Sequence, residues 1–410
     1  GFDDLFIVLV FIFTLFKRIG SGKFSIGKWE FWVFGYWILV TASTIYGVMY
    51  ENIPFGPGMS VAFKTMVKNI TIPMIALIVI YSVDDLKQAK QLIKWFLIAS
   101  VGLSVIALLQ QFYPGTVAAF YQLEKISAGA EVWRATGTTR GPWEIGGVLG
   151  IAIVIGAAFI ILGSGFFSRG MFTFCTIICI IAAIWSRSRS GWVLIFIGLL
   201  AILIFGKKPI LTIFIVLIAS AIVLIFPVLG EVLTKRIEQT GTSGSWSPSV
   251  VYRVMIWKDM LSGIEPGTML MGIGRMGATV KYDATAHNYY VAILIELGFI
   301  GIIYFIFLGI SLWKHTWSNI HSETDPTLMA LWKGVFAVNL GVVFFSITVE
   351  TLDATLIAQV LFFLWSFLYL RDYGINTEDY YYQDYYYPTE SDNLICEIST
   401  DGQQLPMSNY

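Results

Sequence analysis

Long apolar stretches separated by short polar segments follow one another along most of this chain. A helix that crosses a bilayer needs about 20 predominantly apolar residues, and the pattern predicts about eleven such helices. We place them at residues 1–16, 30–49, 61–82, 93–112, 143–163, 169–186, 190–206, 209–229, 289–313, 327–349 and 354–371. The pattern therefore predicts an all-α, polytopic membrane protein, with one transmembrane domain at 1–371 and a large extracytoplasmic loop at 230–288.

Composition agrees with this pattern. Of the 410 residues, 57% are hydrophobic and 13% are charged, and the mean hydropathy is +0.74. A soluble domain carries roughly 25% charged residues, so most of this surface is expected to face lipid. The net charge of -1 provides no basic field that would attract nucleic acid. Three cysteines are too few for a disulfide framework, and we interpret Cys175 and Cys179 as buried small side chains rather than metal ligands.

The distribution of lysine and arginine predicts the orientation of the chain in the membrane, because these residues favour cytoplasmic connections. They gather in alternate connections, at Lys17, Arg18, Lys23 and Lys28, at Lys87, Lys90 and Lys94, at Lys207 and Lys208, and at Arg371. The connections at 50–60 and 350–353 contain neither residue and are predicted to be external. The first span then runs inward, and since the chain begins at Gly1 rather than Met, we expect one further helix upstream.

The C-terminal segment 372–410 differs from the rest of the chain. It has no lysine or arginine and carries eight carboxylates, together with the tyrosine clusters 380–382 and 385–387. Low hydrophobicity and a single sign of charge are typical of disorder, so we predict a disordered, acidic, tyrosine-rich cytoplasmic tail.

Some segments predicted to be external nevertheless carry basic residues. These are Arg134 and Arg140 in 113–142, Arg187 and Arg189 in the turn WSRSRSG, and several cations in 230–288, among them Arg253. Long loops translocate regardless of charge, so the short turn is the informative case. Its arginines indicate either anchoring to lipid headgroups or an anionic ligand. We favour the ligand, because the planar guanidinium donates two parallel hydrogen bonds to phosphate.

The piece SPSVVYRVMIWKDML within 230–288 is predicted to form a helix on the outer membrane surface. Ser249 is expected to be its N-cap. Its apolar stripe is predicted to consist of Val250, Val254, Trp257 and Leu261. Arg253 and Trp257 are four residues apart and hence neighbours on the helix, which holds Arg253 at the depth of a lipid diphosphate.

His287 is the histidine that falls on the predicted outer side, whereas His315 and His321 fall in the connection 314–326 and are read as loop residues. Imidazole changes protonation near neutral pH and is the natural general base. Glu296 follows about 13 Å deeper and on the opposite helix face, so it is expected not to touch His287. A carboxylate inside a membrane is costly and is predicted to have a partner in the bundle.

The segment MGIGRMG spells G-x-G-x-x-G at Gly272, Gly274 and Gly277. A dinucleotide site with this pattern needs a preceding strand and a following helix, and neither is predicted here. We therefore interpret the segment as flexible backbone near the site.

Four pieces of the chain, in order, resemble the superfamily of O-antigen ligases and O-antigen or exopolysaccharide repeat-unit polymerases. RATGTTRGPWEIGG (134–147) is similar to the family's R-x-T-G-T block followed by Pro and a span, and SRSG (188–191) to its Ser-Arg turn. Arg253 and Trp257 match an R-x-x-x-W element. AHNYYVAILIELGFIG (286–301) is similar to the His-Asn block with its downstream Glu-x-Gly-x-x-Gly. The detailed resemblance covers roughly 134–313.

The resemblance implies a type C glycosyltransferase-like membrane fold in the bacterial cytoplasmic (inner) membrane, with an outward-facing active site. It implies a donor glycan on undecaprenyl diphosphate and a saccharide acceptor, and it requires no cofactor, metal or nucleotide. On this basis His287 is the expected catalytic base, and Arg189 and Arg253 are expected to bind the diphosphate. Additional substrate contacts are predicted at Arg134, Arg140, Trp257 and Asn288, and Glu296 is assigned a structural or functional intramembrane role.

Polymerase and ligase differ only in the acceptor, which is another lipid-linked glycan or a lipid A-core saccharide. Thr139-Arg140 stands where many members have Phe and a small residue, and Gly-Pro-Trp-Glu stands near the ligases' usual Pro-Asn. These departures favour a polymerase. Transfer to a protein hydroxyl, a non-catalytic scaffold, and a lipid-linked glycan transporter or flippase are the alternatives. Transporters place their polar groups at the bilayer midplane, whereas the candidate residues here gather at one face.

Overall fold

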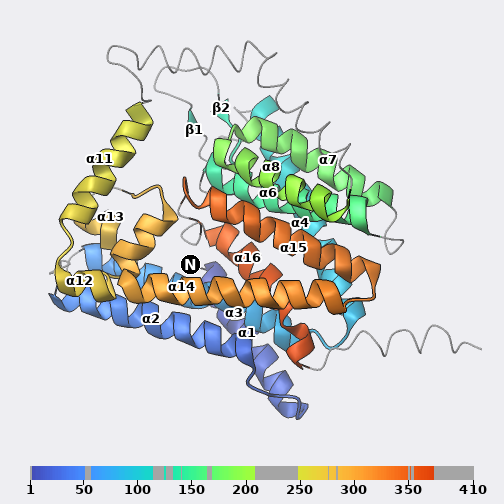
Figure 1. Ribbon diagram of the computed structural model, residues 1–410, viewed down its shortest axis with the longest axis horizontal. Helices are drawn as coiled ribbons and strands as arrows, with labels where there is room; N and C mark the ends of the chain where they lie inside the picture. Colours follow the sequence, from blue (N-terminus) through green and yellow to red (C-terminus); the bar gives the residue numbers. More distant parts are fainter. Residues whose placement is uncertain are drawn as a thin grey trace, which may run out of the picture.

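The computed structural model describes residues 2–50, 57–113, 124–125, 133–139, 141–163, 169–207, 248–275, 277–282, 285–349, 351 and 355–373. Its helices are α1 (Phe2–Gly20), α2 (Lys28–Tyr50), α3 (Pro57–Ser82), α4 (Leu86–Phe112), α6 (Pro142–Leu162), α7 (Arg169–Ser186), α8 (Arg189–Phe205), α11 (Pro248–Ser262), α12 (Pro266–Met271), α13 (Gly277–Tyr282), α14 (Tyr289–Ser322), α15 (Pro326–Phe345) and α16 (Thr355–Leu368), followed by the 3-10 turn η1 (Leu370–Tyr373). Two short antiparallel strands, β1 (Glu124–Lys125) and β2 (Trp133–Arg134), accompany them (Figure 1).

The described helices confirm a polytopic membrane protein. Seven of them, α2, α3, α4, α6, α7, α14 and α15, are long and apolar enough to cross a bilayer, and α8 and α16 are shorter apolar helices. The predicted spans at 30–49, 61–82, 93–112, 143–163, 169–186, 289–313 and 327–349 correspond to those seven. The predicted span 209–229, the first part of the loop (230–247) and the tail from 374 lie outside the described residues, so the total of about eleven spans stays a prediction.

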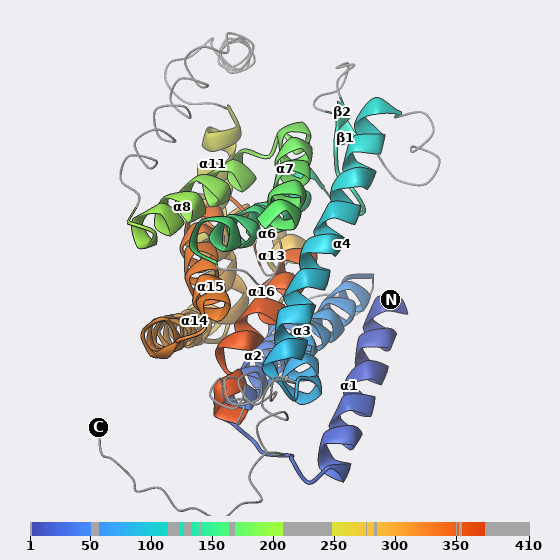
Figure 2. The same cartoon turned by 90° about the vertical axis from the view of Figure 1, so that its right-hand side faces the viewer.

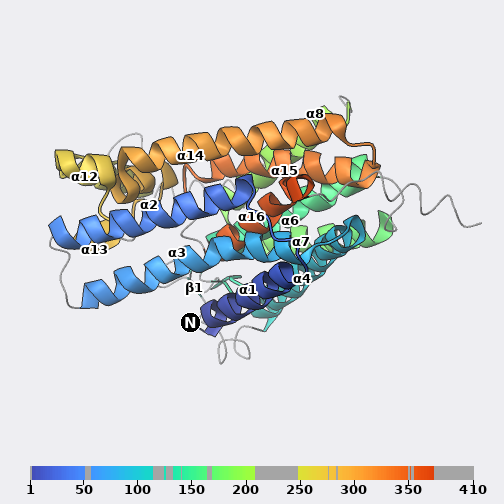
Figure 3. The ribbon, with the colours of Figure 1, turned by 90° about the horizontal axis from the view of Figure 1, so that it is seen from below.

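The bundle has two ends, which we name the site end and the opposite end. At the site end, α2 and α4 finish and α8 and α14 begin. At the opposite end, α1 finishes near Asp84, and α4 and α15 begin. Figures 1 and 3 show α2 and α14 running side by side along the long axis, and Figure 2 shows α1 at the periphery.

Helix α6 lies at the centre and is the most deeply buried of the candidate spans. It packs against α7, α8 and α15. Small residues allow the close approach, because a Cβ on Gly191 would meet the backbone oxygen of Gly146 at 2.7 Å, and one on Gly146 would meet the Ser188 side chain at 2.4 Å. Small residues at helix contacts are typical of membrane bundles, where backbones pack closely. The contact joins the start of α6 to the start of α8.

Helix α14 is longer than predicted and contains a break. It extends to Ser322, so His315 and His321 lie on the helix and the prediction of loop residues in 314–326 was wrong for them. Apolar residues end near 313, but no breaking residue follows until the Asp325-Pro326 start of α15, so the helix continues beyond its apolar part. Within the helix, Gly298 has a non-helical backbone with φ 66°.

Helix α11 also differs from the prediction in two ways. It begins at Pro248, so Ser249 lies inside the helix and was wrongly predicted as its N-cap. Of the predicted stripe, Val254 and Leu261 are exposed, whereas Met260 is fully buried and packs with Ile273 and Ala286. The protein contact therefore includes Met260, which lies outside the predicted stripe, whereas Val254 and Leu261 of the stripe remain available to the lipid surface.

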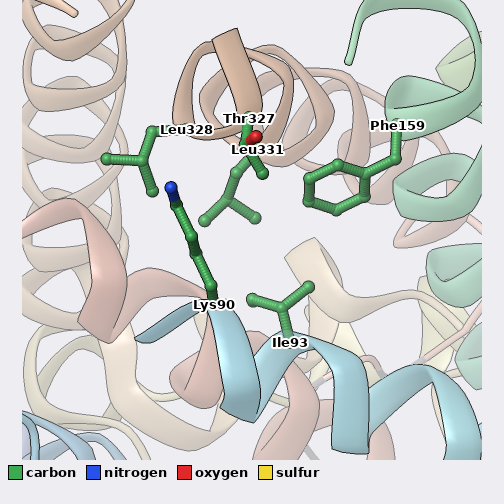
Figure 4. Close-up of a pocket in the computed structure, with 6 residues that line it drawn as sticks. All are labelled: Lys90, Ile93, Phe159, Thr327, Leu328 and Leu331. Carbon is green, nitrogen blue, oxygen red and sulfur yellow. The ribbon is translucent and has the colours of Figure 1, made fainter. Parts of the chain in front are cut away.

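The opposite end is closed by ion pairs. Lys90 of α4 lies 2.7 Å from Asp325, and both side chains are largely buried. Asp325 also caps α15 by accepting from the amides of Thr327 and Leu328. A cavity of about 10 Å³ beside this pair, lined by Lys90, Ile93, Phe159, Thr327, Leu328 and Leu331, has room for about one water molecule (Figure 4). It is too small for an organic substrate, so the candidate site lies elsewhere.

Candidate functional site

Three predicted residues come from three different elements. Arg189 is the first residue of α8, Arg253 lies on α11, and His287 immediately precedes the N-cap of α14. In Figure 1, α11 stands at the left edge, at the end of the bundle where α14 begins. More than thirty residues separate each of these positions from the next, so only the fold can bring them together.

Electrostatic coupling links the three side chains. Burial lowers the pKa of the Arg253 guanidinium, and the positive charge of Arg189 lowers it further. Neighbouring protein displaces part of the hydration of the His287 ring and lowers its pKa below 6.5, and the charge of Arg253 adds to this effect. The charge contribution to each shift requires the two groups to be near one another, Arg189 to Arg253 and Arg253 to His287, because coupling between charges is screened within about 10 Å in salt solution. Arg189, Arg253 and His287 thus form one cluster.

The two arginines of this cluster have no carboxylate partner among the residues that the structure describes. The ion pairs found in those residues involve other cations, such as Lys90 and Arg275. Arg189 in addition stands in the first turn of α8, whose N-terminus carries partial positive charge of its own. Two guanidiniums and a helix N-terminus that are not balanced by carboxylates favour the binding of an anion.

The backbone around His287 is held on both sides. His287 has φ 50°, a left-handed conformation that is uncommon for a residue with a side chain. Before it, the carbonyl of Ala286 accepts a hydrogen bond of 2.6 Å from Trp257 Nε1. After it, the amide of Tyr289 donates to the Ser346 carbonyl at 2.9 Å. The Thr285 hydroxyl lies 3.0 Å from His287 Nε2, so the ring also has a polar neighbour.

The hydrogen bonds of the Asn288 side-chain oxygen go to the backbone of helix α14. Its carboxamide oxygen accepts hydrogen bonds from the amides of Tyr290 and Val291, at 2.9 and 3.2 Å, and so caps α14. Substrate contact by Asn288, predicted from the sequence, stays a prediction. The cap fixes where α14 begins and therefore where the preceding residue, His287, projects.

Two further arginines, Arg134 and Arg140, were predicted to contact substrate. Arg134 belongs to the short strand β2, and Arg140 lies outside the described residues, so their roles stay predictions. The turn between them is anchored by Gln110 of α4, which the sequence did not single out. Its amide nitrogen donates to the Gly137 carbonyl at 2.6 Å, and its oxygen accepts from the Thr136 and Gly137 amides at 2.9 and 2.7 Å.

Arg187, the other arginine of the short turn, is placed apart from the coupled cluster by its partners. Its guanidinium carbon lies 6.0 Å from the centre of the Trp185 ring. Burial lowers its pKa, and no charged neighbour contributes to that shift. A cation over an indole ring is a stabilising arrangement, so Arg187 already has a partner within the protein. Arg189 is the arginine of this turn that is coupled to Arg253.

The carboxylate Glu296 lies inside the membrane-spanning part of α14, where an unpaired charge is costly, and it has the ionic partner that was predicted. Arg275 Nη1 lies 2.9 Å from Glu296 Oε2, and both side chains are almost completely buried. Glu296 is nine residues beyond His287, so the pair stabilises α14 below the cluster. Arg275 was counted only as one of several cations of the loop. Its position inside the MGIGRMG segment, directly after Gly274, gave no signal of a buried partner.

The break in α14 is filled by the MGIGRMG segment. The amides of Ile273 and Gly274 donate to the carbonyls of Ile295 and Glu296, at 3.0 and 2.9 Å, which the break leaves without helical partners. A Cβ on Gly272 would meet the Glu296 backbone at 2.3 Å, and one on Gly298 would meet the Leu270 carbonyl at 2.3 Å. The prediction of flexible backbone was wrong, because these glycines permit tight packing against α14.

Comparison with protein families adds independent information. Residues 174–306 match the family model described as O-antigen ligase. This match confirms the predicted resemblance to the superfamily of O-antigen ligases and repeat-unit polymerases. The O-antigen ligase match spans most of α7, all of α8, α11, α12 and α13, and the first part of α14. It therefore includes Arg189, Arg253 and His287, and it supports glycosyl transfer of the O-antigen ligase or polymerase type in a membrane. A search of curated proteins found no significant match.

Proposed function

We propose that the protein is a metal-independent membrane glycosyltransferase that moves a glycan from undecaprenyl diphosphate to a hydroxyl group of an acceptor glycan. The observation that carries the proposal is the coupled cluster: burial and Arg253 lower the pKa of His287, and neither Arg253 nor the neighbouring Arg189 has a carboxylate partner among the described residues. We assign the reaction to a polysaccharide repeat-unit polymerase in the bacterial inner membrane, with the site end facing outward.

In the proposed step, neutral His287 accepts the proton of the acceptor hydroxyl through a ring nitrogen. The oxygen attacks the anomeric carbon of the donor, and the bond between that carbon and the phosphate oxygen breaks. The electron pair leaves with undecaprenyl diphosphate, and the proton held by His287 passes to solvent. A lowered pKa keeps the imidazole neutral, and hence able to accept a proton, at neutral pH.

Arg189 and Arg253 stabilise the negative charge that grows on the leaving diphosphate. This interaction is stronger in the transition state than in the ground state, so it accelerates the chemical step rather than only tightening binding. Besides burial, the charge of Arg253, which lies close to that of Arg189, disfavours protonation of His287 before the substrate arrives. Diphosphate binding compensates these charges, which favours the protonated imidazole at the stage when it has just accepted the acceptor proton.

The broken helix α14 is the observation that favours a transporter, because transporters often bind substrate at discontinuous helices. Here the break is occupied by the backbone of 270–274, and the charged side chain at that level is paired with Arg275. Irregular backbone within a membrane is tolerated where protein covers it. The break thus has a structural explanation, and we favour glycosyl transfer.

The proposal is tested with purified protein in lipid vesicles, incubated with lipid-linked repeat units. A ladder of chain lengths is expected for a polymerase. Transfer only to an added lipid A-core acceptor would replace that assignment with a ligase. Failure to consume the donor with either acceptor, combined with movement of donor between the leaflets, would overturn glycosyl transfer in favour of the transporter.

A further inference from the structure

Helix α11 is connected to the rest of the described structure along one side of its C-terminal half. Met260 and the partly buried Ile256 pack in a small apolar cluster with Ile273, Ala278, Ala286, Ala292 and Ile295. The Tyr282 hydroxyl donates to the Met260 carbonyl at 3.2 Å. These contacts hold the end of α11 that is farther from Arg253, which lies nearly two turns before Met260.

Trp257 provides the connection closest to the cluster. It lies one turn after Arg253, and its indole nitrogen donates the 2.6 Å hydrogen bond to the carbonyl of Ala286. Ala286 directly precedes His287 in the chain. A single hydrogen bond therefore joins the helix that carries the arginine to the peptide unit that orients the histidine.

The conformation of His287 makes this connection important. Its left-handed backbone is less favourable than ordinary geometry for a residue with a side chain, so neighbouring contacts must maintain it. The Ala286 carbonyl is held by Trp257 on one side, and the Tyr289 amide is held by Ser346 on the other. Removal of the indole donor would release one of these two restraints and the connection of α11 that lies closest to Arg253, while Met260 and Tyr282 still hold the end of the helix.

We propose that Trp257 is a positioning residue, which holds Arg253 of α11 and the backbone of His287 in fixed relation through its hydrogen bond to Ala286. This role differs from the substrate contact that was predicted for Trp257 from the sequence. The effect of this role on catalysis rests on the proposed function. The structural part, that Trp257 keeps the Arg253 charge close to the His287 imidazole, does not rest on it.

The test separates the two roles by removing only the donor. Replacement of Trp257 by 3-benzothienylalanine retains a bicyclic aromatic ring of nearly the same shape but has sulfur in place of the N–H group. Trp257→Phe provides a genetically simpler version. Trp95→Phe serves as the matched control, because Trp95 is an exposed tryptophan on α4, towards the opposite end.

The readout is the pKa of His287, measured by NMR of ring-labelled histidine in nanodiscs. The chain has three histidines, so His315→Gln and His321→Gln assign the signals. Arg253→Gln sets the reference, since it removes the charge that lowers the His287 pKa. We expect the donor-free variants to raise that pKa towards the Arg253→Gln value, and Trp95→Phe to leave it unchanged. Arg253 is the charged neighbour that contributes to the His287 shift besides burial, and Arg189 acts in turn on Arg253.

Kinetics provide the second readout. Loss of positioning is expected to lower kcat about tenfold with the benzothienyl residue, with little change in KM, because the ring remains available for any stacking. An unchanged His287 pKa in a folded donor-free variant would overturn the inference. A shifted pKa in a protein that shows no glycan transfer at all would reject the proposed function and leave the positioning role standing.

Discussion

The two ends of the helix bundle treat positive charge in opposite ways. At the opposite end, a single carboxylate, Asp84, lies within 4 Å of Lys17, Arg18 and Lys23, and Asp372 and Asp325 neutralise Lys28 and Lys90. At the site end, Arg189 and Arg253 have no carboxylate within the described part of the chain, and each charge is close enough to disturb the next titratable group. The comparison teaches that fold stability and ligand binding use the same residue types in different surroundings.

The largest expected effect comes from removing the base at the site end. His287→Ala is expected to lower turnover by roughly 10²–10⁴-fold, the usual contribution of proton transfer by a positioned side chain. Single-turnover measurements with lipid-linked donor would show this loss, while gel filtration reports an intact protein. Wild-type turnover by a folded His287→Ala variant would contradict the assignment of the base.

The second-largest effect is expected on stability. It concerns the buried ion pair of Arg275 and Glu296. Glu296→Gln leaves Arg275 charged and without its carboxylate partner, and we expect a loss of about 3–5 kcal/mol in the free energy of unfolding. The double variant Arg275→Met/Glu296→Leu removes both charges and is expected to lose much less. Unfolding in mixed micelles measures both. Equal losses in the single and double variants would argue against the ion pair as the source of stability.

Replacement of an arginine by a lysine sharpens the contrast between the ends. Arg189→Lys keeps the charge but loses the planar pair of donors, so turnover is expected to fall roughly ten- to hundredfold. Lys23→Arg at the opposite end, where the side chain is mostly exposed, is the matched control and should leave turnover unchanged. Comparable turnover of the Arg189→Lys variant and the wild type would mean that a point charge is sufficient.

The dependence on pH follows from the sign of the His287 shift. Burial and Arg253 lower the pKa of the imidazole, so the neutral form persists to lower pH than 6.5, and the acid limb of the kcat/KM profile, which reports the free enzyme, is expected below that value. Arg253→Gln removes one cause and should move the limb to higher pH, towards 6.5, besides lowering the rate. A limb that stays in place would show that Arg253 does not act on the base.

The smallest effect is expected at the opposite end. Asp84→Asn removes the carboxylate shared by three cations, but the pairs with Lys17 and Lys23 are largely solvated. Exposed pairs contribute about 0–1 kcal/mol each, so we expect a small loss of stability and unchanged turnover. A hundredfold loss of turnover in this variant would remove the distinction between the two ends.

Much of the fold could be predicted because apolar length is a local property. The spans from 30–49 to 169–186 were recognised in this way. The cluster was predictable because arginines in short external turns oppose the orientation rule and are therefore noticeable. In contrast, Gln110, Arg275 and the break at Gly298 were not identified. Each depends on a partner far away in the sequence, such as Gly137 for Gln110 and the 270–274 backbone for Gly298.

The start and end points of helices show a second limit. Ser249 looked like a cap because serine favours that position, but helix α11 begins one residue earlier, at a proline whose ring suits a first turn. The continuation of α14 to Ser322 was missed because the count of apolar residues finds the part inside lipid, not the end of the helix. Hydrophobicity defines the membrane segment, and only capping residues define the helix.

The discontinuity in α14 has a consequence for the kind of membrane in which the protein can work. Nine residues, Tyr289–Leu297, separate the break from the N-cap, so the imidazole stands at a set height of about 13 Å above a backbone joint that Gly272 and Gly298 lock in place. The close packing at Gly272 and Gly298 keeps α14 and the 270–274 backbone in fixed register. The depth at which the phosphates of the proposed lipid-linked donor lie, however, depends on the length of the acyl chains around the protein. Hydrocarbon thickness thus becomes part of the geometry of the reaction, and one chain length brings the phosphates level with His287.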